Sequence, residues 1–81
     1  MSHEVLNRLR SAIGRQLGVP AAQVTPNLRM GDHIEWNSMG HMNLVVALEK
    51  EFGIRFPSYA LSRITSVQLI EKELSRLLNH A

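Results

Sequence analysis

Ser38 and His41 are the two residues of this chain whose types and spacing could support chemistry at one place. Three residues apart on a helix, their side chains could touch, as a nucleophile and its base do. A hydrolase would also need a third group to orient the histidine and an oxyanion hole, and the sequence indicates neither. His33 lies nearby, but two loosely spaced histidines are too few ligands for a metal ion. We therefore expect no catalytic residue and no metal site.

The serine has a different potential use, because it stands where a helix is predicted to begin. The first backbone N–H groups of a helix have no partner within the helix, and the helix dipole favours a negative group there. A phosphate ester on the Ser38 oxygen would be held well at such a terminus. Gly40 is expected to leave room for a bulky group to approach the backbone. The simpler alternative is that Ser38 only caps the helix, since serine is a favoured N-cap residue.

The helix that Ser38 opens is predicted to run to Phe52 and to carry two apolar faces. At about 100° per residue, the core-facing side contains Leu44, Val45, Leu48 and Phe52. His41 turns toward this core side. The methionine face, nearly opposite, contains Met39, Met42 and Val46. A helix in a small domain needs only one apolar face for its core, so the methionine face predicts a surface for a partner.

The elements that position this helix are also predicted to be helical. Residues 3–17 carry apolar side chains at spacings of three and four, with Ser2 as the N-cap and Gly18 as the stop. A short helix is expected over residues 58–63. The last helix should run to about residue 78, with Thr65 as its N-cap and Gln68 reaching back in a capping box. Its core face contains Val67, Ile70, Leu74, Leu77 and Leu78.

Residues 18–37 form a long connection, since two prolines and two glycines rule out a long helix there. A loop of this length in a compact domain needs anchors, and a single turn is expected around residues 21–24. The expected anchors are the apolar side chains Val24, Leu28, Ile34 and Trp36. The chain is thus predicted to be all-α, a bundle of three main helices and one short helix in a single domain over residues 1–81.

Composition and charge exclude several classes of protein. With 81 residues, of which 44% are hydrophobic, the chain can bury one modest core. It has no cysteine, which excludes disulfides and thiolate metal sites. Its net charge of +2 and its pI of about 9.7 come from scattered Lys and Arg residues. The sequence therefore gives only a weak indication of a nucleic-acid-binding surface. No segment is typical of a signal peptide or a membrane span, and a cytoplasmic location is expected.

The residues around Ser38 resemble the attachment segment of acyl carrier proteins. That family has Asp-Ser-Leu at the start of a helix that ends in Ala-Leu-Glu-x-x-Phe-x-Ile. Here residues 37–39 read Asn-Ser-Met, and residues 47–54 read Ala-Leu-Glu-Lys-Glu-Phe-Gly-Ile. Residues 18–20 (Gly-Val-Pro) and 64–67 (Ile-Thr-Ser-Val) also match, and the similarity covers nearly the whole chain. Asn37 keeps the hydrogen-bonding shape of the usual aspartate but lacks its charge.

The resemblance implies an acyl-carrier four-helix bundle with a 4′-phosphopantetheine arm, taken from coenzyme A, on Ser38. The thiol of this arm would carry acyl groups as thioesters, without catalysis by the protein itself. The implied partners are a phosphopantetheinyl transferase and the enzymes that load and process the acyl group. We expect a stand-alone monomer that binds no nucleic acid and has no membrane span. The implied docking surface contains apolar Met39, Met42 and Val46 and polar Asn43, Glu49 and Lys50.

Charge distinguishes this chain from many fatty-acid carriers. Asn43 and Lys50 stand where those carriers have acidic residues, and segment 58–63 has no carboxylate. Because electrostatic complementarity sets partner choice, we infer a dedicated carrier for a specialised fatty-acyl, lipid or polyketide pathway. Three alternatives remain open. They are a carrier of aminoacyl or peptidyl groups, a carrier-like docking module left unmodified because of Asn37, and a helical nucleic-acid-binding module.

Overall fold

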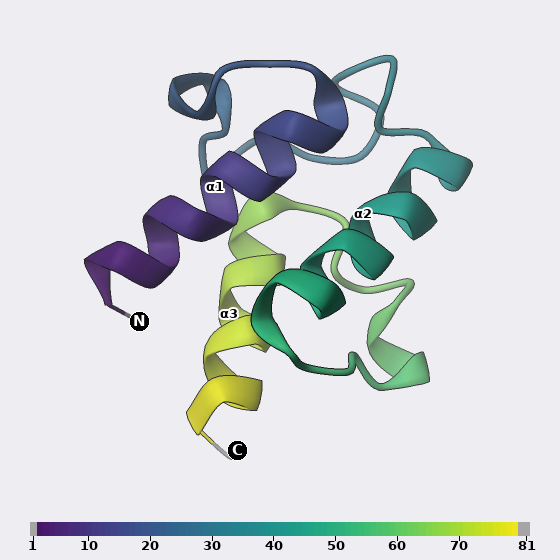
Figure 1. Cartoon of the computed structure of the whole chain (residues 1–81). Coiled ribbons are helices and arrows are strands. Elements are labelled where there is room, and N and C mark those ends of the chain that lie inside the picture. The colour runs from purple at the N-terminus through teal and green to yellow at the C-terminus, as the bar shows by residue number, and fades with distance from the viewer. Residues whose placement is uncertain (1, 80–81) are drawn as a thin grey trace.

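Three long helices dominate the structure, a computed structural model that describes residues 2–79 (Figure 1). They are α1 (His3–Leu17), α2 (Ser38–Phe52) and α3 (Val67–Asn79). Two 3-10 turns, η1 (Ala21–Gln23) and η2 (Ser58–Ala60), lie in the connections. Residues 2–79 contain no strand, only an isolated antiparallel bridge between Arg29 and Ser66. The all-α prediction is confirmed, although the short helix is a three-residue turn that ends before the predicted residue 63.

The ends of α1 and the C-terminal end of α2 follow local capping chemistry. The Ser2 hydroxyl accepts a hydrogen bond from the Val5 N–H at 3.1 Å. Gly18 and Gly53 end the two helices with φ angles of 73° and 62°, a left-handed conformation that glycine adopts without a steric penalty. The predicted bounds of α1 and α2 are therefore confirmed.

α3 is capped by Ser66, so the predicted capping box of Thr65 and Gln68 is wrong. The Ser66 hydroxyl accepts a hydrogen bond from the Leu69 N–H at 3.1 Å. The cause lies in the long connection, whose Met30 N–H donates to the Thr65 carbonyl at 2.8 Å. This pairing holds residues 65–66 outside the helix, and α3 begins one residue later than the pattern indicates.

The long connection passes over the top of the helices in Figure 1 and is anchored mainly by Val24 and Trp36. Both side chains are buried, as predicted, and Leu28 is half-buried. Ile34 was expected to be a further anchor, but it is exposed. The Trp36 N–H donates to the His33 carbonyl at 2.9 Å, and this tight turn directs Trp36 inward while Ile34 faces solvent.

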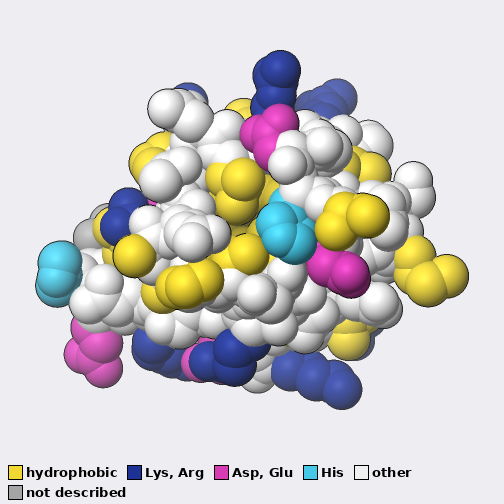
Figure 2. Space-filling model, turned by 90° about the horizontal axis from the view of Figure 1, so that it is seen from above, with side chains coloured by type: hydrophobic (Ala, Val, Ile, Leu, Met, Phe, Trp, Pro, Cys, Tyr) yellow, Lys and Arg dark blue, Asp and Glu magenta, His cyan; other side chains and the backbone are white. Residues whose placement is uncertain are grey.

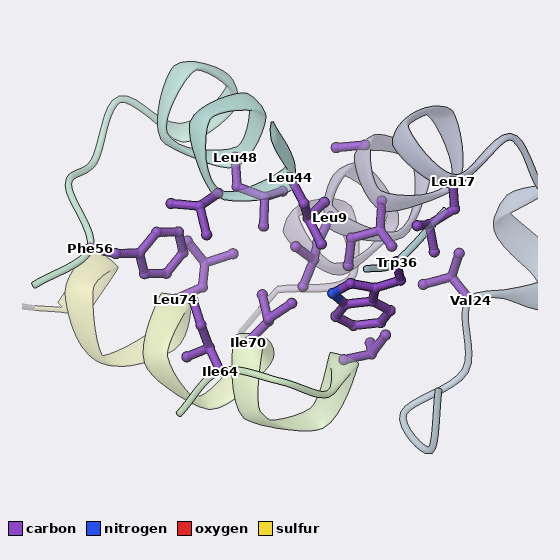
Figure 3. Packing of buried hydrophobic residues seen from close by; sticks show 14 of the residues in the cluster. Leu9, Leu17, Val24, Trp36, Leu44, Leu48, Phe56, Ile64, Ile70 and Leu74 are labelled. Atoms are coloured by element: carbon purple, nitrogen blue, oxygen red, sulfur yellow. The ribbon is translucent and has the colours of Figure 1, made fainter. Parts of the chain in front are cut away.

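The core forms where the three helices and the long connection meet. Figure 3 shows Trp36 among Leu9, Val24 and Ile70, so residues from α1, the long connection and α3 pack together. The predicted core face of α2 is confirmed, with Phe52 only partly buried. On α3 the face is buried at its first three predicted positions, and its last two residues pack at the edge of the core. The core thus fixes one side of α2 and leaves its other side to solvent.

Ion pairs hold the C-terminal end of α2 against α1. Arg8 reaches the Glu51 carboxylate at 3.0 Å and donates to the Glu51 carbonyl at 2.7 Å. Arg15 approaches the same carboxylate at 3.4 Å. The Arg8 guanidinium also lies 4.8 Å from the centre of the Phe52 ring. Such partly exposed pairs add little stability each, but together they fix where α2 ends.

Candidate functional site

Asn37 caps the N-terminus of α2, and this leaves the Ser38 hydroxyl without a structural role. The Asn37 Oδ1 accepts a hydrogen bond from the Gly40 N–H at 2.8 Å, and its Nδ2 donates to the Ile34 carbonyl at 3.2 Å. Ser38 is the first helical residue and is exposed. Its hydroxyl makes no hydrogen bond to any other residue in the range 2–79. The alternative that Ser38 serves only as the cap is therefore wrong.

Gly40 is needed by the fold, because backbone passes close to it. A Cβ atom at this position would lie 1.9 Å from the Glu35 carbonyl oxygen and 3.1 Å from the carbonyl carbon. The backbone of Glu35 therefore fills the space that a side chain would take. Gly40 also lines a shallow depression together with Asn37, Ser38 and Met39, so the expectation that a bulky group can approach here stays a prediction.

His41 is buried, as the rotation along α2 predicts, and both of its ring nitrogens are engaged. Trp36 donates its indole Nε1–H to His41 Nδ1 at 3.0 Å. His41 Nε2 lies 2.9 Å from the Leu61 carbonyl oxygen. Because the indole can only donate and the carbonyl can only accept, this arrangement requires a neutral ring with its proton on Nε2. No ring nitrogen is left to act as a base toward Ser38.

This buried network joins three segments that are distant along the chain. It connects the end of the long connection, the first turn of α2 and the segment after η2. The rings of Trp36 and His41 are nearly parallel, with planes 17° apart and centroids 6.2 Å apart, as an in-plane hydrogen bond between them requires. The sequence predicts that both side chains turn inward, but it does not predict that they pair. The network fixes the first turns of α2, and with them the position of Ser38.

The methionine face of α2 is exposed, as predicted. Met39, Met42 and Val46 are 76%, 47% and 46% exposed, respectively. Ile34, whose carbonyl is bonded by Asn37, is 84% exposed and adds apolar surface at the N-terminal end of the helix. The exposure of Ile34 could have been predicted only if the inward direction of Trp36, two residues later, had been known.

An apolar groove begins at Ser38 on the side of α2 that faces η2. It is lined by Met30, Ser38, His41, Met42, Leu61, Ser62 and Thr65. Its walls come from the long connection, from α2 and from the segment after η2. The Trp36–His41–Leu61 network lies behind one end of this groove and holds its walls together.

The three polar residues predicted to border the methionine face have different roles. Asn43 and Lys50 are exposed. The Glu49 carboxylate accepts a hydrogen bond from the Phe56 N–H at 2.9 Å and is partly buried. Glu49 therefore stabilises the extended segment after α2 and helps to place Phe56 in the core, a role that the sequence pattern does not indicate.

Comparisons with known proteins agree with this geometry. Residues 7–74 match the family described as "Phosphopantetheine attachment site". The chain is 32% identical over 65 residues to an acyl carrier protein of Cyanidioschyzon merolae, which covers 80% of this chain and 71% of that protein. It is 34% identical over 65 residues to an acyl carrier protein of Thermobifida fusca. This alignment covers 80% of this chain and 82% of that protein. The chain belongs to the acyl carrier protein family.

Membership of this family identifies a carrier protein, not an enzyme, whose cofactor is covalently bound 4′-phosphopantetheine. The start of α2 fits such a group. It offers an exposed hydroxyl, and the N–H groups of Ser38 and Met39 have no acceptor within residues 2–79. No helix in the described part of the chain is long and apolar enough to cross a membrane. Nor do three potential metal ligands gather anywhere between residues 2 and 79.

The capping role of Asn37 gives a testable prediction. We expect Asn37→Ala to lower the free energy of unfolding by about 1 kcal/mol, because the bond to the Gly40 N–H is lost. Asn37→Asp should stay close to the unsubstituted protein. It keeps the acceptor and adds a favourable charge of about 0.3–1 kcal/mol at the helix terminus, although it loses the donor to Ile34.

Denaturant unfolding followed by circular dichroism measures both Asn37 variants. Asn43→Ala is the matched control, because Asn43 is exposed on the same helix and caps nothing among the described residues. Equal losses in the alanine and aspartate variants would contradict the capping role of Asn37.

Proposed function

We propose that Ser38 carries the 4′-phosphopantetheine arm of this acyl carrier protein and that residues 1–81 act as one carrier domain. The observation that carries this proposal is that Asn37 caps α2 in place of Ser38. The serine oxygen is thereby left available as a nucleophile. It would attack the phosphorus of coenzyme A that bears pantetheine, while its proton passes to a base of the transferase. The bond to the second phosphate breaks, and adenosine 3′,5′-bisphosphate leaves.

The electrostatics of the helix terminus support this assignment. A phosphodiester on Ser38 keeps one negative charge beside the first turn of α2. The unpaired N–H groups of Ser38 and Met39 and the helix dipole favour that charge, by about 0.3–1 kcal/mol at an exposed site. The carrier thus supplies a pre-formed place for the charged end of the arm.

The arm itself supplies a thiol that carries the acyl group as a thioester. The role of the protein is to shelter the acyl group and to present it to enzymes. The apolar groove beside Ser38, with Met30, Met42 and Leu61 in its walls, can cover an acyl chain. The methionine face presents the free serine to the transferase and the arm-bearing serine to the enzymes that load and process the acyl group. Asn43 and Lys50 border this face.

The charge of the chain supports a specialised fatty-acyl, lipid or polyketide pathway. The net charge of +2 and the exposed Lys50 differ from the acidic surface that many fatty-acid carriers present. Poor charge complementarity would then disfavour docking of this carrier on the enzymes of general fatty-acid elongation. If the loaded protein served general fatty-acid elongation enzymes as well as their usual carrier does, the pathway part of the proposal would fail.

Intact-mass spectrometry tests the role of Ser38. The protein is incubated with coenzyme A and a broad-specificity phosphopantetheinyl transferase. We expect complete conversion to a species with one added arm, and no conversion at all of Ser38→Ala, because only the nucleophilic oxygen has been removed.

Ser58→Ala is the matched control, since Ser58 is an exposed serine at the start of η2. It should be converted as fully as the unsubstituted protein. Addition of an arm to Ser38→Ala would move the attachment site elsewhere. A protein that several transferases leave unchanged would favour the unmodified docking module.

A further inference from the structure

The two ends of the methionine face carry opposite charges. At the N-terminal end, Glu35 is exposed in the depression that contains Ser38. At the C-terminal end, Lys50 and Arg55 line another shallow depression, which begins at Val46. The apolar face of α2 thus runs from an acidic end at the serine to a basic end about three turns later.

The cations at the basic end are not neutralised within the fold. Neither Lys50 nor Arg55 forms an ion pair with any residue between 2 and 79. The neighbouring acids are already engaged. The Glu49 carboxylate accepts the Phe56 N–H, and Glu51 pairs with arginines of α1. Lys50 and Arg55 together outweigh the Glu49 carboxylate that lines the same depression, so this end of the helix offers a net positive charge to a partner.

The face over the long connection has a different character. Figure 2 shows that face from above, with hydrophobic side chains gathered near a histidine and carboxylates, while Lys and Arg lie toward its edges. On this face positive charge thus lies at the margins, around an apolar centre.

We propose that the enzyme surface that receives this carrier is an apolar pocket bordered by acidic side chains, which meet Lys50 and Arg55. This inference rests on the carrier function proposed above and names the chemistry of the partner. The exposed Met42 and Val46 fill the pocket, and the acidic border sets the orientation in which Ser38 enters the active site. A basic partner surface would be repelled at this end, which slows encounter and suppresses docking.

A pair of synthetic amphipathic helical peptides tests this chemistry. Both have the same leucine and phenylalanine face, and their flanking charges are all Glu in one and all Lys in the other. Each is titrated into the ¹⁵N-labelled, arm-loaded protein at low salt. We expect the acidic peptide to bind more tightly and to shift the amide signals of the methionine face and of residues 50–55.

Charge-reversal variants test whether Lys50 and Arg55 cause the preference for the acidic peptide. Lys50→Glu combined with Arg55→Glu should weaken binding of the acidic peptide about fivefold to tenfold, as the loss of two partly exposed charge contacts predicts. Lys72→Glu combined with Arg63→Glu makes the same change of net charge at exposed positions outside α2. This control should change the affinity less than twofold.

Three results would overturn the inference: equal or tighter binding of the basic peptide, no binding of either peptide, or an equal effect of the two double variants. The outcome is separable from that for Ser38, because loading of the arm is read by intact mass in the same samples. A loaded protein without charge preference overturns only the inference about the partner. Failure of loading would instead remove the proposed role of Ser38.

Discussion

Replacing His41 with alanine is expected to lower the free energy of unfolding by about 3–5 kcal/mol. The change removes a buried ring and leaves one buried and one partly buried group without partners. The Trp36 indole N–H loses the acceptor 3.0 Å away, and the Leu61 carbonyl loses the donor 2.9 Å away. Each unsatisfied buried group costs about 1–3 kcal/mol, and the cavity adds to this loss.

Urea unfolding followed by fluorescence measures this loss at the site itself, because Trp36 is the single tryptophan of the chain. His3→Ala is the matched control. His3 is exposed at the start of α1, and its replacement should change the stability by no more than about 0.5 kcal/mol. His41→Gln retains a donor and an acceptor and should recover part of the loss. If His41→Ala proved as stable as the control, the network would not stabilise the fold.

Most helix bounds could be predicted because their signals are local. The φ-positive glycines after α1 and α2 and the hydroxyl of Ser2 act on backbone groups within a few residues. The rotation along α2 likewise separates Leu44 and Leu48 from the exposed methionine face without any knowledge of tertiary packing. For these elements, residue type and spacing were sufficient.

The long connection was less predictable, because its residues are placed by partners far away in sequence. Ile34 and Trp36 are both large and apolar, and hydrophobicity alone predicts that both are anchors. The acceptor on His41 makes the inward position favourable for Trp36, whose N–H must be satisfied when it is buried. The start of α3 was set by pairing with Met30 in the same way, so the serine and not the threonine became its cap.

At the candidate site the exposed methionine face could be predicted from the sequence, but the cap could not. Asparagine and serine are both favoured N-cap residues, and here they are adjacent, so propensity could not choose between Asn37 and Ser38. The choice depends on tertiary geometry. Asn37 can bond at both ends of its amide, to the Gly40 N–H and to the Ile34 carbonyl, whereas a serine has only one short oxygen to offer.

Gly40→Ala is the second substitution with a large expected effect, because backbone occupies the place of the new side chain. Its Cβ would lie 1.9 Å from the Glu35 carbonyl oxygen, so the connection must move away from the first turn of α2. Such overpacking costs about 1–3 kcal/mol or more, partly offset by about 1 kcal/mol of helix propensity. The same movement displaces Asn37 and Ser38. We therefore expect attachment of the arm to slow about tenfold to a hundredfold, the scale of a misplacement near 1 Å.

Gly14→Ala separates this displacement from a general loss of stability. A Cβ on Gly14 would lie 2.6 Å from the Val19 carbonyl oxygen, so this variant also forces backbone apart, but at the end of α1. Both variants should be destabilised in urea, while only Gly40→Ala should load slowly when the initial rate is followed by intact mass under conditions where both are folded. Equal loading rates would mean that the contact between Gly40 and Glu35 does not position Ser38. A selective loss would show that the glycine acts by letting the connection hold Asn37 and Ser38 in place.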